Sequence, residues 1–376
     1  MNNSPSNHVV TAEQLYAWVE AYAEFGDHRT GTSVDHLTAQ WMSMRLGDFG
    51  LEVEGVSEPF DRYVAESELT ADGAAVDHLP VYYCFDGSVA TDKVHVVSFD
   101  PMSGGFPGAV DGAIDEARAS GAEAAVLVTQ HPEGSLVAVN RVLGAASAEF
   151  PVVLAAGRDL DRLQNGYIQL ALQASTEPGM TLNVVGTNLR MFDEDIADPL
   201  MLTTPLNGWF GCAGERGSGI AVLLGVVAKL RERAMMVVAT GGHELGYFGA
   251  HRWVEKNRVE PSAIVHVGAS IAVLGDDGEL IATRMSMASE NAATMASATD
   301  ALAPVGLAPT PDVTGWIGEG EAFHNVGVPL LSFTGAGIDF HTPEDTPARA
   351  TTPEVLARVV DAVAAAAVAF DEAVRA

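Results

Sequence analysis

Cysteine and lysine are scarce in this chain of 376 residues. The two cysteines, Cys84 and Cys212, are too few for a disulfide framework or a thiolate metal cage. Lysine occurs only at positions 93, 229 and 256, and 20 basic residues stand against 50 acidic ones, which gives a formal net charge of -30. Because such an acidic surface repels phosphate groups, we expect neither a nucleic acid nor a membrane as a partner.

Long apolar runs are also missing, although 48% of the residues are hydrophobic and the mean hydropathy is +0.15. No run reaches the length that a transmembrane helix needs. The stretch Met1–Trp18 lacks the basic and then apolar pattern of a secretory signal. We therefore expect a cytoplasmic protein with one large or two moderate domains, and the sequence leaves open whether it forms a homo-oligomer.

The second half of the chain alternates apolar strands with amphipathic helices. Strands are predicted at 181–185, 200–204, 235–239, 263–267 and 329–334, and helices at 220–232, 247–256 and from 352 to the C-terminus. Before them, Thr11 and Ser33 are expected to cap two helices, and 51–60 to form a strand. This order predicts an α/β fold with a mostly parallel mixed sheet flanked by helices.

Residues 65–181 have a different texture, with short strands and glycine-rich turns. Strands at 94–99, 124–129 and 150–155 and a helix around 113–120 indicate a β-α-β rhythm. We interpret 65–181 as an inserted accessory domain that shapes or covers a site built by 1–64 and 182–376.

The strand 235–239 ends in Thr240-Gly241-Gly242 and leads to His243 and Glu244. Glu215 and His341 also follow predicted strands, and the carboxyl ends of parallel strands meet at one edge of a sheet. Two carboxylates and an imidazole suit zinc in an open site. Taken singly, each residue has a plainer interpretation as a solvated turn residue, a charge at a helix N-terminus, or a loop histidine.

Four stretches of the chain carry recognisable motifs: HRTGTSVDHLTAQWMSMRLGDFGLEVE, GERGSG, GGHELGYFG, and GVPLLSF followed by FHTPEDT. They resemble the motifs of the zinc aminopeptidases of metallopeptidase family twenty-eight, which also includes the glutaminyl cyclases. The resemblance implies a three-layer sandwich of the zinc-aminopeptidase type. The segment 65–181 resembles the smaller α/β protease-associated domain that many members carry.

Family members usually hold two zinc ions with five ligands and a glutamate base. On this chain the motifs place two ligands at Glu244 and His341, and the bridging Asp at Glu215. Thr204 and Gly268 stand where the other two ligands belong, and both of these belong to one metal. The resemblance therefore implies at most one zinc ion.

The remaining trio, Glu215, Glu244 and His341, corresponds to the single-zinc set of the glutaminyl cyclases, and three ligands leave an open position for water or a carbonyl. His243 stands where the family has its catalytic glutamate. An imidazole there can act as acid or base near neutral pH.

A metal-free site is the alternative. Arg216 can pair with Glu215 or Glu244 and fill the metal position, and Arg216, His243, Glu244 and His341 would still suit acid–base work or carboxylate binding. In a third interpretation His243 activates Cys212 as a nucleophile, whereas the plainer expectation for Cys212 is a small buried filler.

Further candidates for substrate binding flank these motifs. They are Thr204, Trp209, Cys212, Trp316, Glu319 and Glu321. The two tryptophans lie in glycine-rich loops, and the two glutamates can bind an amine or a hydroxyl or belong to a solvated loop.

We expect a divergent hydrolase that acts on an amide or related C–N bond of a small or short peptide-like substrate, with catalytic residues His243, Glu244 and Arg216. Two-zinc exopeptidase activity is not expected, and the alternatives are a metal-free enzyme of cyclase or lyase type and a non-catalytic binding protein.

Overall fold

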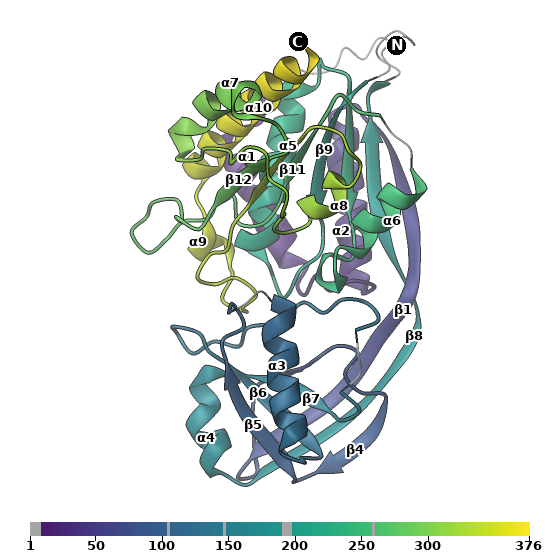
Figure 1. Ribbon diagram of the computed structural model, residues 1–376, viewed down its shortest axis with the longest axis vertical. Helices are drawn as coiled ribbons and strands as arrows, with labels where there is room; N and C mark the ends of the chain where they lie inside the picture. The colour runs from purple at the N-terminus through teal and green to yellow at the C-terminus, as the bar shows by residue number, and fades with distance from the viewer. Residues whose placement is uncertain (1–8, 104–105, 146–147, 190–197, 258–259) are drawn as a thin grey trace.

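The computed structural model of the chain has two lobes, and a nine-stranded mixed sheet lies mainly in the larger one and extends into the second through β1 and β8 (Figure 1). The structure describes residues 9–103, 106–145, 148–189, 198–257 and 260–376. The main path of the sheet runs β12-β13-β11-β9-β10-β8-β1-β2, and β4 pairs with β8. Its strands are β1 (Glu52–Ala71), β2 (Ala74–Ala75), β4 (Gly87–Thr91), β8 (Ile168–Thr187), β9 (Leu200–Pro205), β10 (Met235–Thr240), β11 (Ala263–Val267), β12 (Met285–Ala288) and β13 (Leu330–Thr334).

Four central strands, β13, β11, β9 and β10, are parallel, while the outer pairs are antiparallel. Both faces of this sheet are buried, since Leu200 and Leu202 belong to one core and Met201 to another. On the first face lie α1 (Ala12–Glu24), α2 (Ser33–Asp48), α5 (Ser218–Leu230), α7 (Ala292–Leu302) and α10 (Pro353–Arg375). The second face is covered by α6 (Phe248–Lys256) and α8 (Gly320–His324). The expected α/β fold, a mixed sheet flanked by helices, is confirmed.

The helix starts follow local sequence signals. Thr11 accepts a hydrogen bond from the amide of Gln14 at 3.2 Å, as the capping pattern predicts. The cap of α2 is Thr32 instead of the predicted Ser33: the Thr32 hydroxyl accepts from the amide of Asp35 at 3.2 Å, so the helix begins at Ser33 itself. None of the helices that the structure describes is long and apolar enough to cross a bilayer.

The second lobe is built on a smaller, four-stranded sheet with the order β3-β7-β6-β5 (Figure 1). Its strands are β3 (His78–Pro80), β5 (Val94–Phe99), β6 (Ala124–Thr129) and β7 (Val152–Ala156), and its helices are α3 (Phe106–Ala119) and α4 (Leu160–Asn165). The strands β5, β6 and β7 are parallel. This agrees with the β-α-β rhythm of the sequence.

Two strands of 20 residues each, β1 and β8, connect the lobes. They pair along their whole length, from Glu52 opposite Thr187 to Ala71 opposite Ile168. Both are longer than predicted and extend through the expected domain boundaries at 64/65 and 181/182. The division into two domains, and the protease-associated nature of 65–181, stay predictions.

Candidate active site

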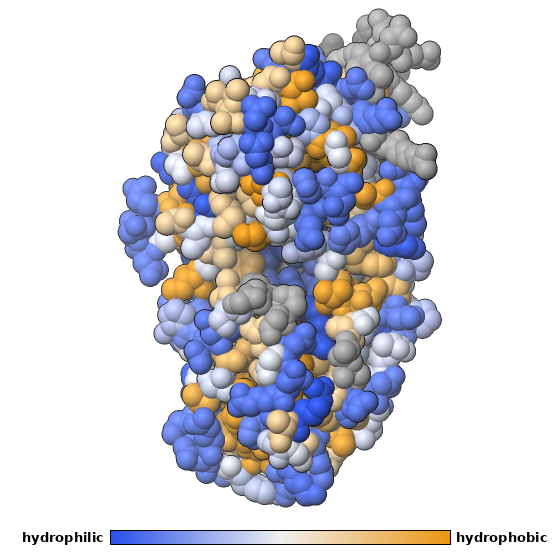
Figure 2. All heavy atoms as spheres, viewed as in Figure 1, coloured by the Kyte–Doolittle hydropathy of each residue, from blue (hydrophilic) through white to orange (hydrophobic). Residues whose placement is uncertain are grey.

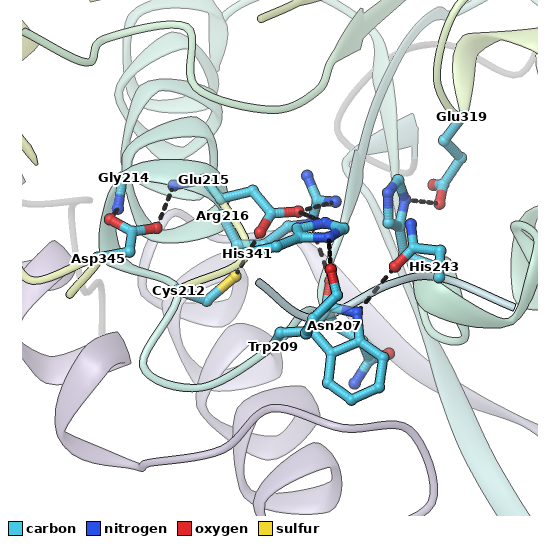
Figure 3. A network of polar contacts seen from close by, with 12 residues as sticks. Asn207, Trp209, Cys212, Gly214, Glu215, Arg216, His243, Glu319, His341 and Asp345 are labelled. Carbon is cyan, nitrogen blue, oxygen red and sulfur yellow. Dashed lines mark hydrogen bonds and ion pairs between the residues drawn. The ribbon is translucent and has the colours of Figure 1, made fainter. Parts of the chain in front are cut away.

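The loops after the parallel strands meet at one edge of the main sheet, and they bring together the polar side chains shown in Figure 3. After β10 the chain turns at Gly241 and Gly242. A Cβ at Gly241 would lie 2.1 Å from the hydroxyl oxygen of Thr181, and Gly242 has a φ of +78°. Only glycine suits both positions, and the turn delivers His243 and Glu244 into the site.

His243 is paired with Glu319, which comes from the start of α8. Its Nδ1 lies 2.9 Å from Oε2 of Glu319, and the other carboxylate oxygen accepts a hydrogen bond from the hydroxyl of Thr240. Glu319 is 1% exposed, and 9% of the His243 side chain reaches the surface. The pair has the arrangement of a base whose ring is oriented by a carboxylate.

Burial shifts the titration of both partners. It lowers the pKa of His243 well below its usual value, and the charge of Arg216 adds to that effect. It raises the pKa of Glu319 to about 7. His243 is therefore neutral near pH 7, and a proton on Nδ1 lets it donate to ionised Glu319.

A second cluster lies beside the first and consists of Glu215, Arg216 and His341 (Figure 3). Nη2 of Arg216 lies 2.7 Å, and Nε2 of His341 3.1 Å, from the same Oε1 of Glu215. All three residues are 1% exposed. Burial alone would raise the pKa of Glu215, but the charges of Arg216 and His341 outweigh it and lower this pKa to about 2.

Asn207 hydrogen-bonds to both clusters. Its position in the sequence did not predict this role. Its carbonyl accepts from Nε of Arg216 at 2.8 Å, and its side-chain oxygen accepts from the amide of Gly242 at 2.8 Å. Asp345 supports the second cluster, because its carboxylate accepts from the amides of Gly214 at 2.6 Å and Glu215 at 2.9 Å. Asp345 lies in the FHTPEDT motif, which is the signal that marks it.

These residues do not fit a zinc site. Glu244 is held elsewhere, with Oε1 accepting from the amide of Thr30 at 2.5 Å, and burial raises its pKa to about 7. Within the described part of the chain, no three His, Cys, Asp or Glu side chains are placed to hold a metal ion. The guanidinium of Arg216 contacts Oε1 of Glu215, so this carboxylate already has a positive partner. The predicted trio Glu215, Glu244 and His341 is therefore corrected to an ion-paired cluster, from which Glu244 is separate.

Two buried candidates have structural partners. Thr204 donates to the carbonyl of Val267 at 2.8 Å. Cys212 is fully buried, and its thiol lies 3.3 Å from Oε2 of Glu215. Burial and the charge of Glu215 raise the thiol pKa well above its usual value, so the nucleophile interpretation is wrong and the buried filler is confirmed.

Of the predicted substrate-binding residues in the loops, some lie in packed clusters and others lie at the surface. Trp209 is 2% exposed, with its ring 5.0 Å from that of Tyr82, and belongs to a packed aromatic cluster. Trp316 is half-buried with its ring 4.9 Å from that of His324, and Glu321 is exposed. Of the two loop glutamates, the structure brings Glu319 into the cluster.

The second lobe touches the site through backbone atoms, which no sequence motif predicts. The amide of Ala138 donates to the carbonyl of His341 at 2.8 Å, and the amide of Arg141 donates to that of Glu244 at 2.9 Å. Between them, Asn140 accepts from Nε1 of Trp209 at 2.9 Å. The second lobe thus contacts the loops that carry Trp209, Glu244 and His341.

The sheet order, the helix layers and the edge at which the loops meet define a three-layer fold of the aminopeptidase type. Residues 203–367 match the family model described as Peptidase family M28. This match, together with the solved structures described next, supports the resemblance to that family.

Solved structures with this fold include BSAP, a zinc aminopeptidase from Bacillus subtilis, with 17% identity over 95% of this chain and 94% of that one and a TM-score of 0.73. An aminopeptidase from Aneurinibacillus sp. strain AM-1 has 16% identity over 96% and 94%, with a TM-score of 0.63. A glutaminyl cyclase from Porphyromonas gingivalis has 12% identity over 97% and 98%, with a TM-score of 0.52. No curated relative matches the chain. At these identities the likeness shows the fold alone.

Proposed function

We propose that the protein is a hydrolase that cleaves an amide or related C–N bond of a small or short peptide-like substrate. The observation that carries this proposal is the His243–Glu319 pair, 2.9 Å between Nδ1 and Oε2, at the edge where α/β folds place their sites. The family match and the aminopeptidase fold support amide chemistry.

In the proposed reaction His243 acts as the general base. With Nδ1–H donating to Glu319, its Nε2 is free to accept a proton from a water molecule that attacks the carbonyl carbon. The same nitrogen then returns the proton to the leaving nitrogen as the C–N bond breaks, so that water and amide become acid and amine. General acid–base catalysis of this kind typically contributes about 10²- to 10⁴-fold to the rate.

Arg216 supplies the positive charge of the site. Its guanidinium lies on the side of Glu215 that faces His243 (Figure 3), in a buried region where charges act strongly. BSAP, whose fold is similar, is a zinc aminopeptidase. We assign zinc no step here because the ion-paired Glu215 does not fit its coordination.

The test is the release of amine from a panel of N-acyl amides and aminoacyl anilides. We expect His243→Gln to lower turnover by at least ~10²-fold with an unchanged circular dichroism spectrum. His95→Gln, in β5 of the second lobe, is the matched control and should leave the rate unchanged. If the wild type releases no amine from any substrate, the proposal fails in favour of a binding protein, and cyclisation in place of hydrolysis would indicate the cyclase alternative.

A further inference from the structure

Arg216 has an unsatisfied guanidinium nitrogen in the interior of the protein. Its Nε donates to the carbonyl of Asn207 at 2.8 Å, and its Nη2 contacts Glu215 at 2.7 Å. Nη1 has no hydrogen-bond partner among the described residues, although the side chain is 1% exposed. Buried donors are nearly always paired, so this nitrogen is placed for a ligand that brings its own acceptor.

A second unsatisfied atom has the opposite chemistry. Oε2 of Glu244 also lacks a hydrogen-bond partner within the described part of the chain, whereas Oε1 is held by the amide of Thr30. The charges of Arg216 and Glu244 both act on the carboxyl of Glu319. Of the two unsatisfied atoms, Nη1 of Arg216 is suited to an anion and Oε2 of Glu244 to an N–H group.

We propose that Arg216 binds a carboxylate of the substrate, which makes the substrate an N-acyl amino acid or the C-terminal residue of a short peptide. This inference rests on the proposed function and names its substrate class. A planar guanidinium is suited to carboxylates, and the unpaired Nη1 supplies a donor that Glu215 leaves unused. The unsatisfied oxygen of Glu244 accepts the N–H of the scissile amide, which is adjacent to the carboxylate-bearing carbon in such substrates.

This arrangement favours a negative charge on the substrate next to the scissile bond, whereas the substrate of an aminopeptidase carries a positive one. A substrate with a free amino group carries a positive charge next to the scissile bond, and Arg216 repels it. A terminal carboxylate is attracted instead. His243 is the member of the site that is open to solvent over 9% of its side chain.

The experiment is isothermal titration calorimetry with N-acetyl-L-alanine, N-acetyl-L-alaninamide and L-alaninamide. It uses the full chain carrying His243→Gln, so that binding is measured without turnover. We expect the acid to bind at least ~10-fold more tightly than either amide, a difference of about 1.4 kcal/mol. Equal binding of acid and amide, tighter binding of the free amine, or no binding by folded protein overturns the proposal.

Variants of Arg216 identify the group responsible. Arg216→Lys keeps the positive charge but loses the planar guanidinium with its several N–H donors. We expect it to weaken the preference for N-acetyl-L-alanine over the amides by several-fold. The double variant Glu215→Gln with Arg216→Gln removes both charges together, which avoids leaving a buried carboxylate unpaired, and should abolish the preference. Arg233→Gln, outside the site, should retain it, and if the double variant also retains it the proposal is wrong.

The two proposals fail in different ways. If the acid is preferred but no amide is ever hydrolysed, the assignment of carboxylate binding to Arg216 stands and the hydrolase proposal falls. If neutral amides are hydrolysed and the acid shows no advantage, the hydrolase proposal stands and the carboxylate assignment falls.

Discussion

The guanidinium of Arg216 lies 2.7 Å from the carboxylate of Glu215, and both side chains are 1% exposed. A buried carboxylate needs a positive partner, and here an adjacent residue of the chain provides it. In the aminopeptidase fold this carboxylate occupies the position that the resemblance assigns to a metal ligand. The fold is therefore similar to that of a zinc aminopeptidase, but an Arg–Glu ion pair stands at this position of the site.

The first prediction concerns metal dependence. Dialysis against a chelator should leave turnover unchanged, because Arg216 and not a metal ion is expected to provide the positive charge beside Glu215. Elemental analysis of the purified protein should find zinc well below one ion per chain. Loss of activity on dialysis, with recovery when zinc is added, would contradict this prediction and restore a metal centre.

The second prediction concerns Glu319 as a positioning residue for His243. Glu319→Gln preserves the shape but donates its amide hydrogen to Nδ1, which leaves the proton on Nε2 and removes the base. We expect kcat to fall by ~10²-fold or more. In the wild type kcat/KM should rise through pH 7 as Glu319 ionises, and the variant should lack this rise.

Glu321 offers a matched control for that experiment. It lies two residues further along the same short helix and is exposed. Glu321→Gln should retain both the rate and the pH profile. A purely structural role for Glu319 would predict a stability loss in Glu319→Gln with an unchanged profile.

The third prediction concerns stability as a function of pH. Burial raises the pKa of Glu319 from 4.5 to about 7, so its contribution to stability is fully present below pH 4.5 and is lost as the pH rises through 7. Glu319→Gln removes this titration. As the pH rises from 5 to 8, the free energy of unfolding of the wild type should fall relative to that of the variant, by at most about 3 kcal/mol. Urea denaturation at the two pH values measures it, and an equal difference at both would contradict the expectation.

The fourth prediction concerns the contact of the second lobe with the site. Nε1 of Trp209 donates to the side-chain oxygen of Asn140 at 2.9 Å. A double-mutant cycle with Trp209→Phe and Asn140→Ala should show a coupling of about 1 kcal/mol in the free energy of unfolding. Additive effects of the two substitutions would mean that this bond contributes nothing to holding the lobe in place.

Much of the fold could be predicted from the sequence because its signals are local. The apolar strand 235–239 and the turn at Gly241 and Gly242 need only their own neighbours to be recognised. The lengths of β1 and β8 were underestimated, because their middle residues pair only with each other, and partly exposed strands lack a strong apolar signal. The cap of α2 was misplaced by one residue, since Thr32 and Ser33 are both good caps.

The candidate site, like the fold, was predictable from the sequence only in part. The sequence by itself determined that His243, Glu244, Glu215 and His341 follow parallel strands and reach one edge, because strand direction and loop position follow from the order of elements. Only the tertiary structure decided which of them interact. Glu319 reaches His243 from 76 positions further along the chain, Arg216 pairs with the carboxylate of Glu215, and the amide of Thr30 binds the carboxylate of Glu244. Hydrogen-bond partners are chosen by distance and direction in space, and the residue types alone do not specify these.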